Sequence, residues 1–476
     1  MAEQNNTAEL TVIGGGPGGY AAAFLAADMG MAVTLIDPRT NPGGVCLFEG
    51  CIPSKTLLNA VRLMHAAAAA EKWGLAFAKP EIDLAKLRQW KNDVVDKLTG
   101  GLGRLTQQRN ITHIRGTAVF TGDDRLSIRT RDGAEQTLGF TNAIIATGSR
   151  AASVPGLDFD GDRIVDAGGA LALKDVPGKL LVVGGGYIGL ELGTVYAGLG
   201  AEVTVVEMTP GLLPGADRDL VNVLKKRLGG QFAAMEFETR VSNARVQKNG
   251  VMATLEGTDG ASRKSLFDRV LVAVGRRPNT ADIGLDQTGV ELDDRGFVRV
   301  DEQCRTSVPH IYAIGDAAGE PMLAHKAAHQ GRTAVEVVAG RPVAFEPAAI
   351  PGVVFTEPEI AWAGLTETRA RQQKIKVAVS RFPWAASGRA ATLDQSDGLT
   401  KLVVAPETER ILGVGIVGPG AGEMIAEGVV AIEMGANLTD LRLSIHPHPT
   451  LSETLMEAAD LYFGTATHFY RPKRKK

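Results

Sequence analysis

The strongest constraint on the fold is a glycine-rich pattern that opens the chain. An apolar run over residues 10–13 leads into Gly14-Gly15-Gly16-Pro17-Gly18-Gly19, then an alanine-rich segment to Met29, then a second apolar run ending at Asp37. This order of strand, glycine turn, helix, strand and acid is typical of dinucleotide-binding folds. The glycines allow the backbone to approach a pyrophosphate, which the N-terminus of the helix then binds.

The same pattern occurs a second time at the same spacing. An apolar run over residues 180–183 leads into Gly184-Gly185-Gly186-Tyr187-Ile188-Gly189 and, after a helical segment, to a strand ending at Glu207. Asp37 and Glu207 each follow the first glycine of their copy by 23 residues. Each copy also closes on an apolar strand and a glycine, Gly148 and Gly275 respectively. We therefore predict an internal duplication with two dinucleotide sites.

The first copy carries an insertion that holds two of the three cysteines of the chain, Cys46 and Cys51. Outside a secretory context, such a pair is more often redox-active or metal-binding than structural. Five residues of helix rise about 7.5 Å, whereas bridged cysteines keep their Cα atoms within about 7 Å. A disulfide thus requires a break in the helix between them. Zinc is the alternative, but Cys304 has no ligand-spaced cysteine or histidine beside it, so we favour a redox disulfide.

The position of the cysteines predicts which nucleotide each copy binds. A disulfide beside one nucleotide and opposite another requires a two-electron relay, so FAD is expected in the first copy. NAD rather than NADP is expected in the second, because the Glu207 carboxylate pairs with a free 2′-hydroxyl and repels a 2′-phosphate. No arginine or lysine lies between Glu207 and Arg218 to bind such a phosphate.

Beyond the second copy the pattern changes. An apolar stretch ends at Gly315-Asp316, which would place Asp316 at the C-terminal end of a strand, where ligands of open α/β sheets bind. A simple turn is the alternative. A helix is predicted over 324–338 and a linker over 341–347. From residue 351, strand-like runs precede two helical stretches, which indicates a separate α+β unit.

A histidine-rich motif, His446-Pro447-His448-Pro449, precedes Glu453 near the end of the chain. Pro449 is expected to open a helix that carries Glu453 in its first turn. A carboxylate beside His448 would raise its basicity and fix its tautomer, as a general base for a thiol requires. A structural histidine, or a metal pair of His446 with His448, is the alternative.

Charge and hydropathy exclude several classes of function. The net charge is -3, so no global field favours nucleic acid or an anionic membrane. The N-terminus lacks a signal-peptide pattern, and no apolar run reaches the roughly 18 residues of a membrane span, so we expect a cytoplasmic protein. The basic segment 471–476 is expected to be a solvated tail.

Together these motifs resemble the flavoprotein disulfide reductases, and most closely the dihydrolipoamide dehydrogenases among them. The resemblance follows the order of the family's motifs over nearly the whole chain. The matching segments are the two glycine fingerprints and residues 43–55, 146–148, 275–279, 315–316, 323–327, 355–359 and 446–453.

The resemblance implies a role for each candidate residue. Cys46 would be the interchange thiol that meets the substrate, Cys51 the thiol beside the flavin, and His448, oriented by Glu453, the base. Lys55 would lie near the flavin and pair with Glu191. No metal is implied. FAD would be bound by Gly14, Gly16, Gly19, Asp37, Lys55, Gly148 and Asp316, and NAD by Gly184, Gly186, Gly189, Glu191, Glu207 and Gly275.

The implied fold class is α/β, with two Rossmann-like dinucleotide-binding domains and a C-terminal α+β dimerisation domain. The expected boundaries are 1–150 for the FAD-binding domain with the redox disulfide, 151–276 for the NAD-binding domain, 277–347 for a central part completing the FAD site, and 348–476 for the interface domain. In such an obligate homodimer the base of one subunit reaches the disulfide of the other.

The implied reaction is oxidation of protein-bound dihydrolipoamide to lipoamide with reduction of NAD⁺. The partner would be a lipoyl-bearing protein of a 2-oxo acid dehydrogenase or glycine-cleavage complex. An NADH-dependent reductase of another disulfide and a mainly structural lipoyl-complex subunit are the alternatives. Val45, Phe48 and Glu49 depart from the family pattern, as does the segment 465–476. Glu49 either raises the pKa of the thiols or points to solvent.

Overall fold

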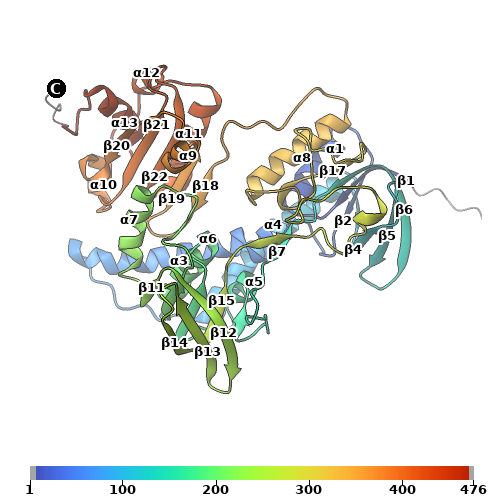
Figure 1. Cartoon of the computed structure of the whole chain (residues 1–476), viewed down its shortest axis with the longest axis horizontal. Helices are drawn as coiled ribbons and strands as arrows, with labels where there is room; N and C mark the ends of the chain where they lie inside the picture. Colours follow the sequence, from blue (N-terminus) through green and yellow to red (C-terminus); the bar gives the residue numbers. More distant parts are fainter. Residues whose placement is uncertain (1–6, 471–476) are drawn as a thin grey trace, which may run out of the picture.

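The computed structural model describes residues 7–470, so the basic tail lies outside the described residues. The first glycine copy forms a mainly parallel sheet in the order β3-β2-β1-β6-β5-β4, with β17 added beside β6 (Figure 1). Its central strands are buried on both faces, which accounts for their continuous apolar sequences. The elements are β1 (Thr7–Ile13), α1 (Pro17–Asp28), β2 (Val33–Ile36), β3 (Thr112–Ile114), β4 (Gly116–Phe120), β5 (Arg125–Thr130), β6 (Glu135–Ile145) and β17 (Ile311–Ala313).

The second copy repeats this arrangement, with a parallel sheet in the order β11-β10-β9-β15-β8. Strands β9 and β10 take the places of β1 and β2, and β15 takes that of β6, so the predicted duplication is confirmed. An antiparallel sheet, β12-β13-β14, was not predicted. The elements are β8 (Ile164–Val165), α5 (Ala167–Leu171), β9 (Lys179–Val183), α6 (Tyr187–Gly198), β10 (Glu202–Val206), α7 (Arg218–Leu228), β11 (Ala234–Glu236), β12 (Thr239–Gln247), β13 (Gly250–Gly257), β14 (Ser262–Phe267) and β15 (Arg269–Val272).

The two nucleotide-binding units are joined where each copy closes. Strand β7 (Ser149–Ala151), after Gly148, pairs antiparallel with β16 (Arg276–Pro278), after Gly275. The chain then returns to the first sheet through β17, whose neighbour is β6. Helix α8 (Ala324–Val338) lies against α1, where a Cβ on Gly331 would stand only 2.6 Å from the carbonyl oxygen of Gly18.

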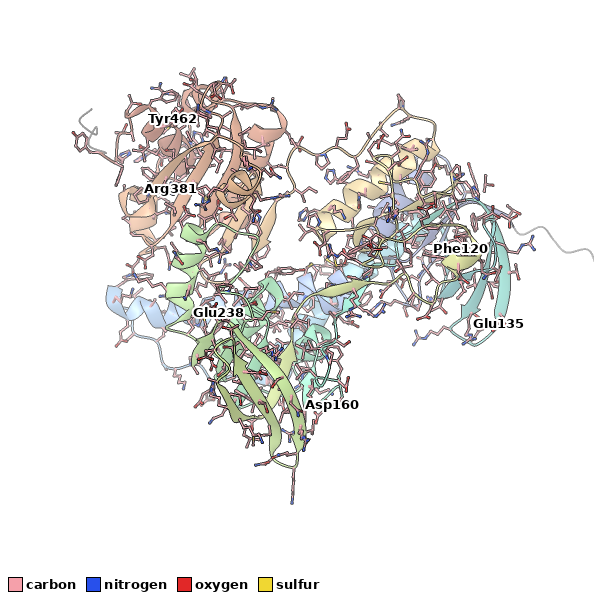
Figure 2. The ribbon with its side chains drawn as sticks, viewed as in Figure 1. Phe120, Glu135, Asp160, Glu238, Arg381 and Tyr462 are labelled. Atoms are coloured by element: carbon pink, nitrogen blue, oxygen red, sulfur yellow. The ribbon has the colours of Figure 1, made fainter. Side chains whose placement is uncertain are left out.

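The C-terminal unit is an antiparallel sheet in the order β18-β19-β22-β21-β20 (Figure 1). Arg381 and Tyr462 lie on this unit, far from Phe120 in the first sheet (Figure 2). The predicted fold class is confirmed. The elements are β18 (Gly352–Val354), β19 (Ile360–Gly364), α9 (Glu367–Gln372), β20 (Ala378–Pro383), α10 (Gly388–Thr392), β21 (Leu399–Val404), β22 (Ile411–Val417), α11 (Ala421–Glu433), α12 (Leu438–Leu443) and α13 (Glu453–Phe463).

One helix start differs from the prediction. Helix α13 begins at Glu453 and not at Pro449. The Glu453 carboxylate accepts a hydrogen bond of 2.7 Å from the amide of Thr450, which ties the preceding residues into a turn ahead of the helix. Glu453 is still in the first turn of the helix, as expected.

Candidate active site

The first glycine turn is built for close backbone approach. Gly14 has φ +106°, and a Cβ on Gly19 would collide with the carbonyl oxygen of Gly14. The carboxylate of Asp37 accepts a 2.7 Å hydrogen bond from the amide of Gly15. Helix α1 then begins at Pro17, so its N-terminal amides face the turn.

The second turn has the same construction. Gly184 has φ +110°, and a Cβ on Gly189 would collide with the carbonyl oxygen of Gly184. Glu207 accepts hydrogen bonds from the amides of Gly185, at 2.7 Å, and Thr209, at 2.8 Å. In both copies the acid accepts a hydrogen bond from an amide of the glycine turn. This contact fixes the carboxylate at the edge of the sheet where a ribose would lie.

The cysteines stand on either side of a break between two helices. Cys46 lies in α2 (Gly44–Glu49) and Cys51 is the first residue of α3 (Cys51–Ala69), with Gly50 between the helices at φ −142° and ψ −114°. The expected break is therefore present. Both thiols are free. A hydrogen bond with Cys46, helped by the charge of Lys55, lowers the pKa of Cys51 to about 7, whereas the same contact and burial raise the pKa of Cys46.

An ion pair links the cysteine helix to the second glycine turn. Nζ of Lys55 lies 2.7 Å from Oε2 of Glu191, in α6. The hydroxyl of Ser54 donates to the same oxygen at 2.8 Å, and the amide of Phe355 donates to Oε1 at 3.0 Å. The ring of Phe355 also lies 4.7 Å from the Lys55 ammonium. Glu191, only 3% exposed, is thus held from two segments, α3 and the residue that follows β18 (Gly352–Val354).

Two cavities meet at these residues. The first, of about 510 Å³, is lined by Gly14, Gly16, Asp37, Cys46, Cys51, Lys55, Gly148, Glu191 and Asp316. The second, of about 1610 Å³, is lined by Gly184, Gly186, Glu207 and Gly275. Tyr187 and Arg276 line both. The structure therefore brings most of the predicted residues of each glycine copy together, and the two groups adjoin. Gly19 and Gly189 line neither cavity, and Glu191, predicted for the NAD site, lines the first cavity only.

The predicted base, His448, lines neither of these two cavities. Nδ1 of His448 is 2.9 Å from Oε1 of Glu453, and the His448 side chain is 68% exposed. His446 differs: it is almost buried, its Nε2 lies 2.7 Å from Glu427, and this contact raises its pKa. Neither histidine lines the cavity that contains the cysteines.

Comparison with known proteins identifies the family. Residues 8–331 match the model of the pyridine nucleotide-disulphide oxidoreductases, and residues 350–459 match the dimerisation domain of the same family. The chain belongs to this family. The predicted family is confirmed, and with it the oxidoreductase activity and the use of FAD and a pyridine nucleotide.

The relatives of this oxidoreductase share its whole length. A dihydrolipoyl dehydrogenase of Vibrio cholerae is 45% identical over 469 residues, 98% of each chain. That of Haemophilus influenzae is 46% identical over 468 residues, again 98% of each chain. Among solved structures, LpdA from Mycobacterium tuberculosis superposes with a TM-score of 0.88 at 27% identity, over 96% of this chain and 99% of the other.

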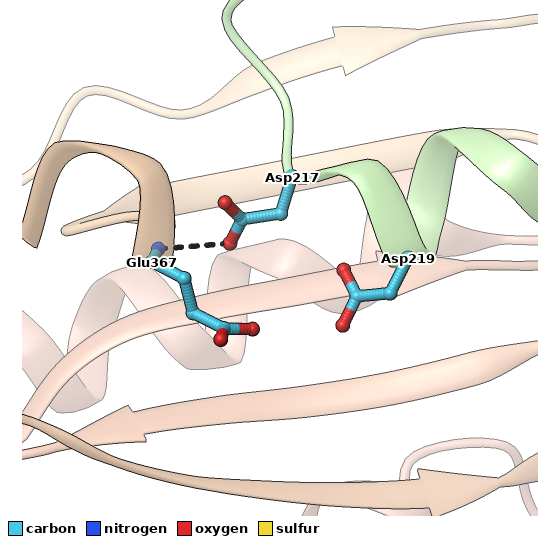
Figure 3. A group of neighbouring side chains, drawn as sticks. All are labelled: Asp217, Asp219 and Glu367. Carbon is cyan, nitrogen blue, oxygen red and sulfur yellow. Dashed lines mark hydrogen bonds between the residues drawn. The ribbon is translucent and has the colours of Figure 1, made fainter. Parts of the chain in front are cut away.

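One group of acids in the oxidoreductase has the spacing of a cation site. Carboxylate oxygens of Asp217, Asp219 and Glu367 lie within 4.8 Å of one another (Figure 3). Nζ of Lys401 contacts all three, at 2.7, 2.7 and 3.0 Å, and Arg381 pairs with Asp219 and Glu367. The cluster is therefore an ion-pair network that joins α7 to the C-terminal sheet.

Sequence reasoning missed three contacts of the site. Phe355 and Ser54 lie within recognised motifs, but nothing in those motifs indicates that both bind Glu191. Arg39 pairs with Glu49 at 2.8 Å and stacks 4.4 Å from the ring of Phe48. The carboxylate between the thiols therefore has a cationic partner. Glu49 and Phe48, which depart from the family pattern, interact with the same guanidinium.

In the described range, residues 7–470, no helix is long and apolar enough to cross a membrane.

Proposed function

We propose that the chain is a dihydrolipoyl dehydrogenase, oxidising a protein-bound dihydrolipoyl group with reduction of NAD⁺. The observation that carries this proposal is the thiol pair in the first cavity, joined through Lys55 and Glu191 to the second glycine turn. The full-length similarity to dihydrolipoyl dehydrogenases supports the choice of substrate.

Both cofactor sites fit the residues that line them. In the first cavity, a turn that tolerates no Cβ, a helix N-terminus and the buried acid Asp37 suit the pyrophosphate and ribose of FAD. FAD, when bound, supplies the two-electron chemistry that connects a dithiol with a nicotinamide. We assign FAD binding to Gly14, Gly16, Gly19, Asp37, Lys55, Gly148 and Asp316, and NAD binding to Gly184, Gly186, Gly189, Glu191, Glu207 and Gly275.

The thiol chemistry follows from the two cysteines. His448 takes a proton from one thiol of the substrate, because the thiolate is the nucleophile. The thiolate attacks Sγ of Cys46, the Cys46–Cys51 bond breaks, and Cys51 leaves as a thiolate. The second substrate thiolate then attacks the sulfur bound to Cys46, which closes the lipoyl disulfide and leaves Cys46 reduced. With Cys46 bound to the substrate its thiol no longer donates to Cys51, and the charge of Lys55 then favours the Cys51 thiolate.

The exposed position of His448 supports a homodimer in which each base serves the disulfide of the other subunit. The C-terminal unit also exposes large apolar side chains: Met434, Leu443 and Ile445 are 80, 74 and 98% exposed, and the last two precede His448 closely in sequence. Such a patch is typical of an interface. The chain carries the family's dimerisation domain.

We assign FAD binding and the redox disulfide to residues 1–150, NAD binding to 151–276, completion of the FAD site to the central part 277–347, and the interface to 348–476. The partner is a lipoyl-bearing protein of a 2-oxo acid dehydrogenase or glycine-cleavage complex, and the location is the cytoplasm.

A steady-state assay tests the proposal. The purified protein loaded with FAD should form NADH from dihydrolipoamide and NAD⁺, and Cys46→Ser should abolish this activity while retaining FAD. Reduced glutathione should give no NADH. Reduction of another disulfide by NADH, without activity on dihydrolipoamide, would favour the alternative of a different disulfide reductase. A flavin-free, inactive protein would favour a structural subunit.

A further inference from the structure

A second pair of carboxylate and imidazole stands one helical turn from the proposed base. Glu457 follows Glu453 by four residues in α13, so the two side chains lie on the same face, with Cβ atoms about 5–6 Å apart. Oε1 of Glu457 lies 2.6 Å from Nδ1 of His468. Two acids that would repel each other along the helix are therefore each matched with an imidazole.

His468 reaches Glu457 because the chain turns back after α13. Gly464 ends the helix in the left-handed conformation, with φ +74°. Thr465 then binds the carbonyl oxygen of Asp460 through its amide, at 3.0 Å. Phe469 packs against the core of the C-terminal unit. These anchors hold His468 beside the helix, in the segment that departs from the family pattern.

Glu457 requires a cationic partner. Its side chain is only 4% exposed, and its second oxygen, Oε2, makes no hydrogen bond within the described residues. Burial of a carboxylate disfavours its ionised form unless a positive charge is close. The His468 imidazole lies 2.6 Å from this carboxylate, and its half-exposed ring remains in contact with water.

Within residues 7–470, several other basic side chains around α13 have partners other than Glu453 and Glu457. Arg442, from α12, pairs with Asp460, and His446 pairs with Glu427. Arg381 and Lys401, from the adjoining sheet, bind Asp219 and Glu367 instead. Glu453 is left facing His448 and His468. Burial raises its pKa, but the Thr450 amide, His448 and His468 hold the pKa below its ordinary value.

We propose that Glu457 and His468 are positioning residues for the base, which keep Glu453 ionised and set the charge that His448 experiences. The proposal rests on the proposed function, in which His448 is the base. Neither Glu457 nor His468 lines the cavity of the thiols, so both act through Glu453.

Direct titration of His448 tests this role. The FAD-loaded holoenzyme is labelled with ¹³C-histidine, and the His448 signal is assigned with His448→Gln. His468→Gln removes the imidazole whose charge lowers the pKa of Glu453, and should raise the midpoint of the His448 titration by about 0.5 pH unit or more. Glu457→Gln removes a negative charge and leaves the His468 cation, so the midpoint should fall. The double variant should return close to the wild-type midpoint.

Shifts of the His448 midpoint in opposite directions in the two single variants indicate an effect of charge. If the two residues had only a structural role, the direction of the shift would not reverse between the variants. The proposal is overturned if both midpoints stay within about 0.2 pH unit of wild type or move in the same direction. If Glu457→Gln fails to fold, His468→Gln alone decides, and an unchanged midpoint refutes the proposal. The titration needs no turnover, so failure of the dihydrolipoamide assay would be a separate result.

Discussion

Nδ1 of His448 lies 2.9 Å from Oε1 of Glu453, yet neither residue lines the cavity that contains Cys46 and Cys51 of the same chain. In the proposed mechanism this pair is the base and its orienting acid, and the His448 side chain is 68% exposed. A second subunit must bring its thiol pair to this histidine, so the proposed mechanism requires the dimer.

The two histidines of the motif should differ in their effect on turnover. We expect His448→Gln to lower kcat/KM for dihydrolipoamide at least about 100-fold, because general-base catalysis is lost. His446→Gln should matter much less, because His446 is engaged with Glu427. Steady-state kinetics of both variants, with retained FAD as the control, decide the assignment. Equal losses would contradict it.

The Lys55–Glu191 pair should modulate ionisation of Cys51. The hydrogen bond with Cys46 is the largest influence that lowers the pKa of Cys51 to about 7; the charge of Lys55 lowers this pKa further, and the charge of Glu191 raises it. In the anaerobically reduced, FAD-loaded enzyme, the long-wavelength thiolate-to-flavin absorbance should grow as the pH rises through about 7. Lys55→Met should move this midpoint upward and Glu191→Gln downward. Shifts of the midpoint in the same direction in both variants would contradict this electrostatic effect of the pair on Cys51.

Glu207 should determine the choice of nicotinamide nucleotide. The amides of Gly185 and Thr209 donate to different oxygens of Glu207, so Glu207→Gln keeps one of these two hydrogen bonds and removes the charge that repels a 2′-phosphate. The ratio of kcat/KM for NAD⁺ to that for NADP⁺ should fall about 10-fold or more, mainly through better use of NADP⁺. Asp37→Asn, the matching change in the first copy, should leave the ratio unchanged. An unaltered ratio in Glu207→Gln would exclude this role.

The network around Lys401 should make stability depend on pH in acid. Burial raises the pKa values of Asp217 and Asp219, but hydrogen bonds and the charge of Lys401 outweigh this, so both pKa values are lowered. Their contribution to stability is full above the ordinary Asp pKa of about 4 and is lost as the pH falls through the lowered values.

Lys401→Met should remove this contribution. The variant leaves the buried Asp217 without its cation, which should lower the free energy of unfolding near neutral pH by about 3–5 kcal/mol. Its stability should also fall less steeply between about pH 5 and pH 3, because Asp217 and Asp219 lose one of the interactions that lower their pKa values. Denaturant unfolding at several pH values measures both effects. If the free energy of unfolding of the variant fell with pH as steeply as that of the wild type, this account of the network would be contradicted.

The parts of the fold that could be predicted from the sequence are those in which only glycine fits, because any side chain would collide with the backbone. A Cβ at Gly19 or Gly189 would strike the first glycine of its turn, so both turns are fixed by sequence. The helix break at Gly50 followed from the reach of a disulfide. The β12-β13-β14 sheet was missed because much of β12 is exposed, and its mixed pattern has no clear period.

Contacts between distant segments could not be predicted. Phe355 lies 164 residues from Glu191, yet its amide binds that carboxylate. His468 meets Glu457 only because the chain reverses after Gly464, and the sequence of that segment has no repeating pattern to indicate its path. Such contacts depend on how the units pack together, which local spacing does not determine.

The most direct test of the account is a two-step anaerobic titration of the FAD-loaded protein. Dihydrolipoamide should produce the long-wavelength thiolate-to-flavin absorbance, and NAD⁺ should then remove this absorbance with stoichiometric formation of NADH. If NADH reduces the flavin but dihydrolipoamide does not, the cofactor sites stand and the proposed substrate is wrong.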